Sequence, residues 1–176
     1  LGDVYKRQVK ITVKESKQFL ERYKQQYSQV FAYLESLKKQ AIAKGYVETI
    51  LGRRRYFELE SKTLRDLKGK PPEQINLQEF KLSQNDAQIL RAAANSPIQG
   101  SSADIIKIAM IRLNEILKNY QTKLLLQVHD ELVFEVPPLE LEELQKVIKY
   151  TMENAINLKV PLIVDIHGGQ NWMEAK

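Results

Sequence analysis

The sequence predicts an α+β fold, in which a small antiparallel sheet built from hairpins packs against helices. The sheet is predicted by a pair of short apolar runs, at 124–128 and 132–136, that are rich in Leu, Val and Phe. The helices are predicted by apolar residues that recur every three or four positions in longer segments. The segments with this spacing are 12–44, 101–119 and 139–158.

The two apolar runs are expected to form one tight hairpin. In the second run Leu132, Phe134 and Val136 alternate with Val133 and Glu135, which is the two-residue period of a strand with one covered face. Two prolines follow directly and end the strand, because proline has no N–H to donate to a ladder. The polar residues between the two runs then form the tip of the hairpin.

That tip consists of His129, Asp130 and Glu131. Carboxylate oxygens suit Mg²⁺, a hard ion that takes one or two protein carboxylates and leaves its other positions to water and phosphate. Two such ions about 3.5–4 Å apart can activate an attacking oxygen and stabilise a leaving one. Composition alone favours the simpler interpretation, a solvated polar turn.

A longer match around the tip points to a specific family. The run Gln127–Pro137, which reads Gln-Val-His-Asp-Glu-Leu-Val-Phe-Glu-Val-Pro, resembles the last catalytic motif of the family A DNA polymerases. The resemblance implies that this hairpin lies in the palm of a polymerase and that Asp130 binds the catalytic metal ions. It also implies that Glu131 lies beside the metal site in a lesser role and that His129 lies near the primer terminus.

Composition narrows the class of protein. The chain has 176 residues, enough for one domain or one compact piece of a larger one. No apolar run approaches the ~20 residues that cross a membrane, no signal peptide is visible, and there are no cysteines, which together favour a cytoplasmic protein. The net charge of +5 favours polyanionic partners, and the basic residues concentrate in the first 81 positions.

The segment 12–44 is expected to be helical. Thr12 and Glu15 have the spacing of a capping box, in which each side chain bonds the other residue's backbone N–H. Ser28 marks a break, which gives two helices, Glu15–Tyr27 and Gln29–Lys44. Gly45 then ends the second helix, because glycine tolerates the left-handed conformation at this position.

A second hairpin is expected over 46–59, with Gly52 at the turn. Three arginines follow the turn, with aromatic residues nearby, and such interleaving suits a nucleic-acid backbone. A solvated basic turn is the alternative. The segment also resembles the family's sequence before the final palm section, so Arg53 and Arg54 are predicted to contact DNA.

The centre of the chain is expected to hold a loop and two helices. Residues 61–82 are polar and contain glycine and prolines, which predicts a surface loop insertion with one helical turn near 63–67. Ser83 caps a helix that runs to Ala94 and ends before Pro97. A new helix starts at the next serine pair, and near the C-terminus a strand at 161–166 is expected to join the hairpin sheet.

The stretch Arg91–Gly100 matches a second signature of the same family. The resemblance implies that Arg91, Asn95 and Gln99 contact the primer–template, largely from the minor-groove side. Donors there can read acceptors that all base pairs present, so binding tolerates any sequence, as a copying enzyme requires. Without the resemblance, helix termination and capping would explain the same residues.

The resemblance also sets the expected domain organisation. Residues 1–8 show no periodicity and are predicted to be a non-native or disordered junction. Residues 9–60 correspond to the end of the fingers helices and a hairpin, 61–82 to the insertion, and 83–176 to the second half of an incomplete palm. The upstream strand that carries the partner Asp and the fingers helix that grips the nucleotide are missing, which leaves the two-ion site incomplete.

The sequence therefore predicts the C-terminal part of a DNA-directed DNA polymerase, inactive alone and monomeric in the intact enzyme. Its expected cofactor is Mg²⁺, and its expected partners are primer–template DNA and deoxynucleoside triphosphates, with no membrane. Two alternatives stay open. The chain could be a non-catalytic DNA-binding module, or a structural α+β domain whose basic charge is incidental.

Overall fold

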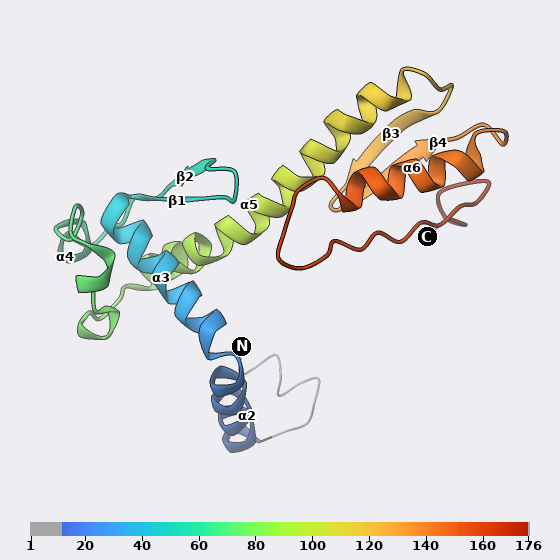
Figure 1. The fold of residues 1–176 in the computed structure, drawn as a ribbon. Coiled ribbons are helices and arrows are strands. Elements are labelled where there is room, and N and C mark those ends of the chain that lie inside the picture. Colours follow the sequence, from blue (N-terminus) through green and yellow to red (C-terminus); the bar gives the residue numbers. More distant parts are fainter. Residues whose placement is uncertain (1–11, 176) are drawn as a thin grey trace. The chain divides into compact units, whose positions relative to one another are not determined.

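The computed structural model describes residues 12–175, which combine helices with two small antiparallel sheets (Figure 1). This confirms the predicted α+β class. The prediction for residues 1–8 lies outside the described residues. No helix among residues 12–175 is long and apolar enough to cross a membrane.

Contacts divide the chain into two compact units, which we describe separately. Unit 1 contains the described residues up to Glu48 together with Arg54–Pro97. Unit 2 contains the turn Thr49–Arg53 together with the chain from Ile98 onward. The hairpin turn 49–53 therefore belongs to a different unit from the two strands that it joins.

Unit 1 begins with two helices, α2 (Val13–Gln26) and α3 (Ser28–Lys44). The capping box forms as predicted, because Thr12 accepts a hydrogen bond from the Glu15 backbone N–H and the Glu15 carboxylate accepts one from Thr12. The helices are separated at Tyr27, and Gly45 ends α3 with a φ of 78°. Both predicted helices and their caps are thus confirmed.

Strands β1 (Tyr46–Glu48) and β2 (Arg54–Tyr56) form the predicted second hairpin, although both are short. Tyr46 pairs with Tyr56 and their rings lie 5.5 Å apart, which is a favourable cross-strand contact. Gly52 sits in the turn with a φ of 79°, a conformation that glycine adopts without strain.

The helical turn predicted near 63–67 is confirmed by the short helix α4 (Lys62–Arg65). The prediction that the rest of 61–82 is a surface loop is wrong in part, because the segment also contains two 3₁₀ helices, η1 (Pro72–Gln74) and η2 (Leu77–Glu79). Leu64 and Ile75 are 1% and 2% exposed and belong to the core of unit 1. These two side chains attach the segment to the core, because burying each removes a large apolar side chain from water, while the other residues of 61–82 stay exposed or partly exposed.

Helix α5 (Gln84–Leu117) is continuous, so the predicted end before Pro97 is wrong. Pro97 cannot donate to the residue four positions earlier, a loss that usually breaks a helix. Here the helix is braced by tertiary structure: the Ser96 hydroxyl donates to the Ala92 carbonyl and accepts from Arg55, and Ala93 is fully buried. The contacts of Ala93 and Ser96 outweigh the tendency of proline to break a helix.

Unit 2 contains strands β3 (Lys123–Val128) and β4 (Glu131–Glu135) and helix α6 (Leu141–Glu153), with α6 alongside the hairpin (Figure 1). This confirms the predicted hairpin. Its core combines residues of α5, α6 and one face of the hairpin. The buried members are Leu113, Leu117, Leu144 and Ile148, and the strand residues packed on them include Leu124, Leu132, Phe134 and Val136.

The predicted strand at 161–166 does not form, and the segment is irregular. A strand is stabilised by a partner for its backbone groups, and within the described chain β3 and β4 pair only with each other. The Val164 N–H is instead satisfied by the Glu153 carboxylate, and Ile163 is 77% exposed. The apolar residues of this segment favour a strand, but they could not supply a partner for it.

The start of α5 depends on a buried carboxylate. Asp86 is fully buried and accepts hydrogen bonds from the Glu60 and Ser61 backbone N–H groups and from the Ser83 hydroxyl. Burial alone would raise its pKa, but these hydrogen bonds outweigh burial and hold the pKa below its ordinary value of 3.8. Ser83 in turn accepts from the Asp86 N–H, which confirms the predicted cap.

We predict that Asp86→Ala lowers the free energy of unfolding by about 2–3 kcal/mol, because the Glu60 and Ser61 backbone N–H groups lose the charged carboxylate that accepts from them. Chemical denaturation at pH 7 measures this change. The exposed Asp66→Ala is the control and should change stability by less than about 0.5 kcal/mol. Because the pKa of Asp86 is lowered on folding, its contribution is present above pH 3.8 and is lost as pH falls through the folded value. Equal losses in the two variants would contradict the assigned role.

Candidate functional site

The carboxylates predicted from sequence lie at the tip of the β3–β4 hairpin. Val128 pairs with Glu131, so the loop between the strands is only two residues, His129 and Asp130. His129 has a φ of 54° and is the one non-glycine residue among 12–175 with a positive φ. Histidine is among the residues that tolerate this conformation, which nonetheless costs ~1–2 kcal/mol. The hairpin therefore holds Asp130 in a turn, as predicted.

Both acids at the tip are available to a ligand. Asp130 and Glu131 are exposed, and neither side chain makes a hydrogen bond or ion pair within the described residues. The Gln127 amide donates to the His129 carbonyl at 3.1 Å, which braces the loop without using either carboxylate. Adjacent, unpartnered oxygen donors fit a hard divalent cation that completes its shell with water and phosphate.

The described residues supply only part of a metal site. No group of three or more His, Cys, Asp or Glu side chains within residues 12–175 is arranged to hold a metal ion. Asp165 and His167 lie in the irregular C-terminal segment and do not complete such a group. Two carboxylates at one tip can hold an ion only together with ligands from elsewhere.

Helix α5 presents the other predicted site residues to solvent. Arg91 and Asn95 belong to unit 1 and are one helical turn apart, so they share one exposed face. Gln99 belongs to unit 2 and is also exposed. None of the three side chains has a hydrogen-bond or ionic partner in the part of the chain that the structure describes. Their donors are free for an external acceptor.

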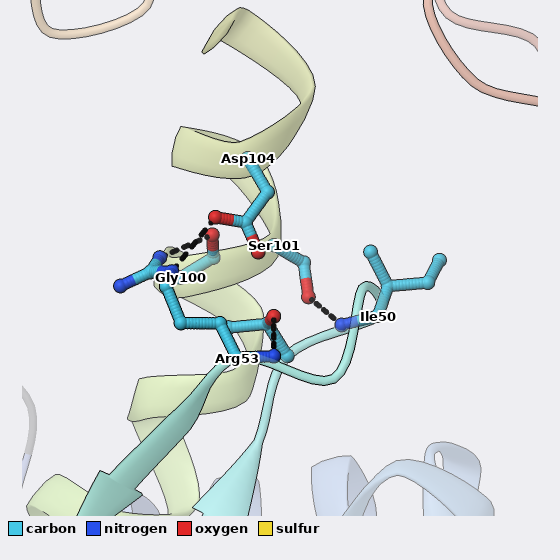
Figure 2. Close-up of polar contacts among 6 residues, drawn as sticks. Ile50, Arg53, Gly100, Ser101 and Asp104 are labelled. Carbon is cyan, nitrogen blue, oxygen red and sulfur yellow. Dashed lines mark hydrogen bonds and ion pairs between the residues drawn. The ribbon is translucent and has the colours of Figure 1, made fainter. Parts of the chain in front are cut away.

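Arg53 is not free in this way. Its Nε donates to Asp104 Oδ1 at 2.9 Å and its Nη2 donates to the Gly100 carbonyl at 3.0 Å (Figure 2). The Asp104 side chain is 6% exposed, whereas that of Arg53 is 52% exposed. The arginine was predicted as a DNA contact, and the structure shows that it also joins the turn 49–53 to α5.

Arg54 and Arg55 are engaged as well. The Arg54 Nε donates to Glu48 at 2.9 Å and its guanidinium lies 4.5 Å from the Tyr46 ring centre. The hydrogen bond to Glu48 is the largest of the effects that raise the pKa of Arg54. Arg55 donates to Ser96 at 3.0 Å. The basic stretch is therefore part of the scaffold, and DNA contact by Arg53 and Arg54 stays a prediction.

The turn 49–53 makes two further contacts with α5. The Ile50 N–H donates to the Ser101 hydroxyl at 2.9 Å, as Figure 2 shows. Gly100 lies so close to the turn that an added Cβ would be 2.6 Å from Thr49 Cγ2, a distance that forces one of the two to move. Only glycine allows this approach at position 100.

Asp104 is the buried acid of this contact. Its burial would raise its pKa, but the Thr49 hydroxyl and the Arg53 guanidinium outweigh burial and lower the pKa below 3.8, and the charge of Lys107 adds to the effect. Asp104 is therefore ionised at neutral pH. Arg53 supplies both a hydrogen bond and the compensating charge that a buried carboxylate needs.

Inspection of the sequence missed Asp104 and Ser101 as partners of the turn. One signal was present, because Asp104 interrupts a helix segment that is otherwise mostly apolar, and a buried acid needs a donor. The identity of the donor could not be read from the sequence, since Arg53 and Asp104 are 51 residues apart.

The fold is thus an α+β scaffold with adjacent exposed acids at a hairpin tip, and with exposed polar side chains on helix α5 that have no partner among residues 12–175. The model of one family, described as DNA polymerase family A, matches residues 4–174. The chain belongs to this family, which confirms the resemblance seen in the two sequence motifs.

Named relatives agree with this assignment. The chain is 57% identical over 172 residues to DNA polymerase I of Synechocystis sp., which covers 98% of this chain and 17% of the relative. It is 46% identical over 168 residues to DNA polymerase I of Streptococcus pneumoniae, again over 17% of the relative. The chain thus spans about one sixth of the length of these relatives.

A solved structure has the same fold. The chain is similar to the POL domain of Pol1 from M. smegmatis in complex with a DNA primer-template and dNTP, with a TM-score of 0.76 and 37% sequence identity. The match covers 97% of this chain and 27% of that one. Nearly all of the present chain therefore corresponds to a minor part of a polymerase domain.

We predict that Gly100→Ala lowers the free energy of unfolding by about 1–3 kcal/mol, although alanine favours a helix by ~1 kcal/mol over glycine. The reason is the clash with Thr49 Cγ2. Thermal and chemical denaturation measure the change. The double variant Thr49→Ser/Gly100→Ala removes that methyl group, keeps the hydroxyl, and should recover most of the loss. No recovery would show that the close approach does not limit position 100.

Proposed function

We propose that this chain is the C-terminal part of a DNA-directed DNA polymerase that transfers deoxynucleotides to a primer 3′-hydroxyl. The observation that carries the proposal is the position of Asp130 and Glu131. Asp130 lies in the two-residue hairpin loop and Glu131 is the first residue of β4. Both are exposed and without a partner among residues 12–175, in a chain that belongs to DNA polymerase family A. Residues 83–176 would form the second half of the palm and 9–60 the end of the fingers.

In the proposed reaction the primer 3′-oxygen attacks the α-phosphate of a deoxynucleoside triphosphate, and pyrophosphate leaves. Asp130 would hold Mg²⁺ through its carboxylate, and Glu131 would lie beside the same site. When bound, magnesium neutralises charge that develops on the attacking and leaving oxygens. The chain's own contribution is a rigid two-stranded support that fixes the direction of Asp130.

Arg91, Asn95 and Gln99 would contact the primer–template, and His129 would lie near the primer terminus. All three helix residues are exposed, have no hydrogen-bond or ionic partner among residues 12–175, and carry N–H donors. The minor groove offers acceptors at every base pair, so such donors bind DNA without selecting a sequence. A polymerase that copies any template needs this tolerance.

Arg53 and Arg54 would add contacts to phosphate. Each uses its Nε in an ion pair, but both side chains are about half exposed, at 52% and 51%. A guanidinium has five N–H donors, so donors stay available after the internal bonds form. The proposed enzyme works as a cytoplasmic monomer on primer–template DNA.

A non-catalytic DNA-binding module is the second candidate. One observation favours it: within the described residues no cluster of three metal-binding side chains is present. The isolated chain would then bind DNA without any step of catalysis. The two predictions below separate this function from that of a polymerase segment.

We predict that the 176-residue chain alone binds primer–template DNA but does not extend it, because it supplies only part of the metal site. Fluorescence titration should show an affinity that falls steeply with salt, since phosphate contacts release counterions. A gel-based extension assay with Mg²⁺ and all four deoxynucleotides should show no product. Binding that is insensitive to salt would favour a structural domain, and extension would refute the partial-site argument.

The second prediction uses a chimera in which this chain replaces the matching segment of Synechocystis DNA polymerase I, to which it is 57% identical. Asp130→Ala should reduce single-turnover incorporation by at least about 10³-fold, because a metal ligand is lost, and change DNA affinity less than about threefold. Asp165→Ala is the matched control, because Asp165 is also an exposed aspartate, and this variant should retain activity. An active Asp130 variant would exclude the metal role, and an inactive unsubstituted chimera would favour the DNA-binding module.

A further inference from the structure

The contact between the turn 49–53 and helix α5 has features that point to a role beyond folding. We call it the turn clamp and define it by Thr49, Ile50 and Arg53 on the turn and Gly100, Ser101 and Asp104 on the helix (Figure 2). All six residues belong to unit 2. The clamp therefore holds a short stretch of helix directly after Pro97.

That stretch of helix is weak by its own composition. Pro97 and Gly100 are the two poorest helix formers, less favourable than alanine by ~3 and ~1 kcal/mol, and they lie within one turn of each other. The α-helix nevertheless continues through both residues. Contacts outside the helix must offset these losses at this point.

The clamp supplies those contacts with a geometry that fits arginine. The Arg53 guanidinium donates through Nε to Asp104 and through Nη2 to the Gly100 carbonyl, so one planar group joins residues one turn apart. A lysine ammonium is a point charge and lacks this fixed pair of donors. The absence of a Cβ at position 100 then allows the turn to reach the helix backbone.

Gln99 is the residue before the clamped glycine. Its backbone is continuous with Gly100, while its side chain is exposed and has no partner in the described chain. The clamp thus restrains the backbone that carries Gln99 and leaves its amide free. Such an arrangement lowers the entropy lost when the amide binds a ligand, because the backbone is already ordered.

We propose that the turn clamp positions Gln99 for contact with the primer–template, with Arg53 and Asp104 as positioning residues. This inference rests on the proposed function, which assigns Gln99 to the DNA. Arg53 then acts mainly through the helix that it braces, and Asp104, whose side chain is 6% exposed, acts entirely from within the fold.

If Arg53 instead contacts DNA phosphate directly, the variant Asp104→Asn should change DNA affinity in the opposite direction. Asp104→Asn removes a negative charge, frees Arg53 from its ion pair, and should strengthen DNA binding if phosphate contact is the main role. If the clamp positions Gln99, the same substitution should weaken binding, because the helix loses its brace.

The first experiment tests the clamp in the 176-residue chain itself, by hydrogen exchange of the backbone N–H groups of residues 101–104. Arg53→Met should speed their exchange by about tenfold, the effect of losing one charged hydrogen bond. Arg54→Met is the matched control, because it loses the same charge and a 2.9 Å ion pair, but that pair joins β1 and β2. Equal exchange in the two variants would overturn the clamp. Arg53→Lys should give an exchange rate between those of the unsubstituted chain and Arg53→Met. Because it keeps the positive charge, it tests the clamp even if Arg53→Met unfolds.

The second experiment uses the chimeric polymerase and a double-mutant cycle. Asp104→Asn should lower kcat/KM for incorporation by about tenfold, but by less than twofold when Gln99→Ala is already present, because the clamp acts through Gln99. Asp86→Asn is the control: it changes another buried acid of α5, and any effect should be the same in both Gln99 backgrounds. If Asp104 has a purely structural role, Asp104→Asn should likewise lower kcat/KM by the same factor in both Gln99 backgrounds.

The outcomes separate a failure of the positioning role from a failure of the proposed polymerase function. If Gln99→Ala lowers kcat/KM but Asp104→Asn has the same effect in both backgrounds, the positioning role is wrong and the polymerase function stands. If Gln99→Ala has no effect, the assignment of Gln99 to the DNA fails, and the positioning role fails with it. Stronger DNA binding by Asp104→Asn would replace the positioning role with direct phosphate contact.

Discussion

Apolar burial along helix α5 is the constraint on which the rest of this structure depends. The helix contributes Leu90 and Ala93 to the core of unit 1, and Leu113 and Leu117 to the core of unit 2. A 34-residue helix that contains proline and glycine is not favoured by its own propensity. Apolar burial at several points along it, at ~25 cal/mol per Å², offsets what the backbone loses.

Two buried carboxylates on α5 join the helix to segments far away in the sequence. Asp86 accepts from the Glu60 and Ser61 N–H groups, and Asp104 pairs with Arg53. Burial by itself would raise the pKa of each acid. Hydrogen bonds, and for Asp104 also the nearby cations, outweigh burial, so that both pKa values lie below the ordinary value. Each acid thus stays ionised, and each gives the helix one specific neighbour, which apolar contact alone does not do.

The acids of the hairpin tip are arranged in the opposite way. Asp130 and Glu131 are exposed and unpartnered, while the strands beside them carry Leu132 and Phe134 into the core of unit 2. The backbone cost lies at His129, whose positive φ turns the chain within two residues. Packing thus holds the hairpin that carries the two acids, and no ion pair within the described chain neutralises them. The metal role proposed for Asp130 requires such an unpartnered carboxylate.

The sequence by itself determined the features that depend on near neighbours. Each of these features spans at most about a dozen residues, so local geometry decides it. They are the capping box at Thr12, the helix end at Gly45, the Asp130 hairpin and the two family motifs. Only the tertiary structure decided the continuation of α5 through Pro97, the burial of Leu64 and Ile75, and the pairing of Arg53 with Asp104. Likewise, the apolar residues at 161–166 favour a strand, but the strand does not form without a partner. The physical reason is that these outcomes depend on energies exchanged between residues distant in sequence, and local preference fixes neither the partner nor the balance.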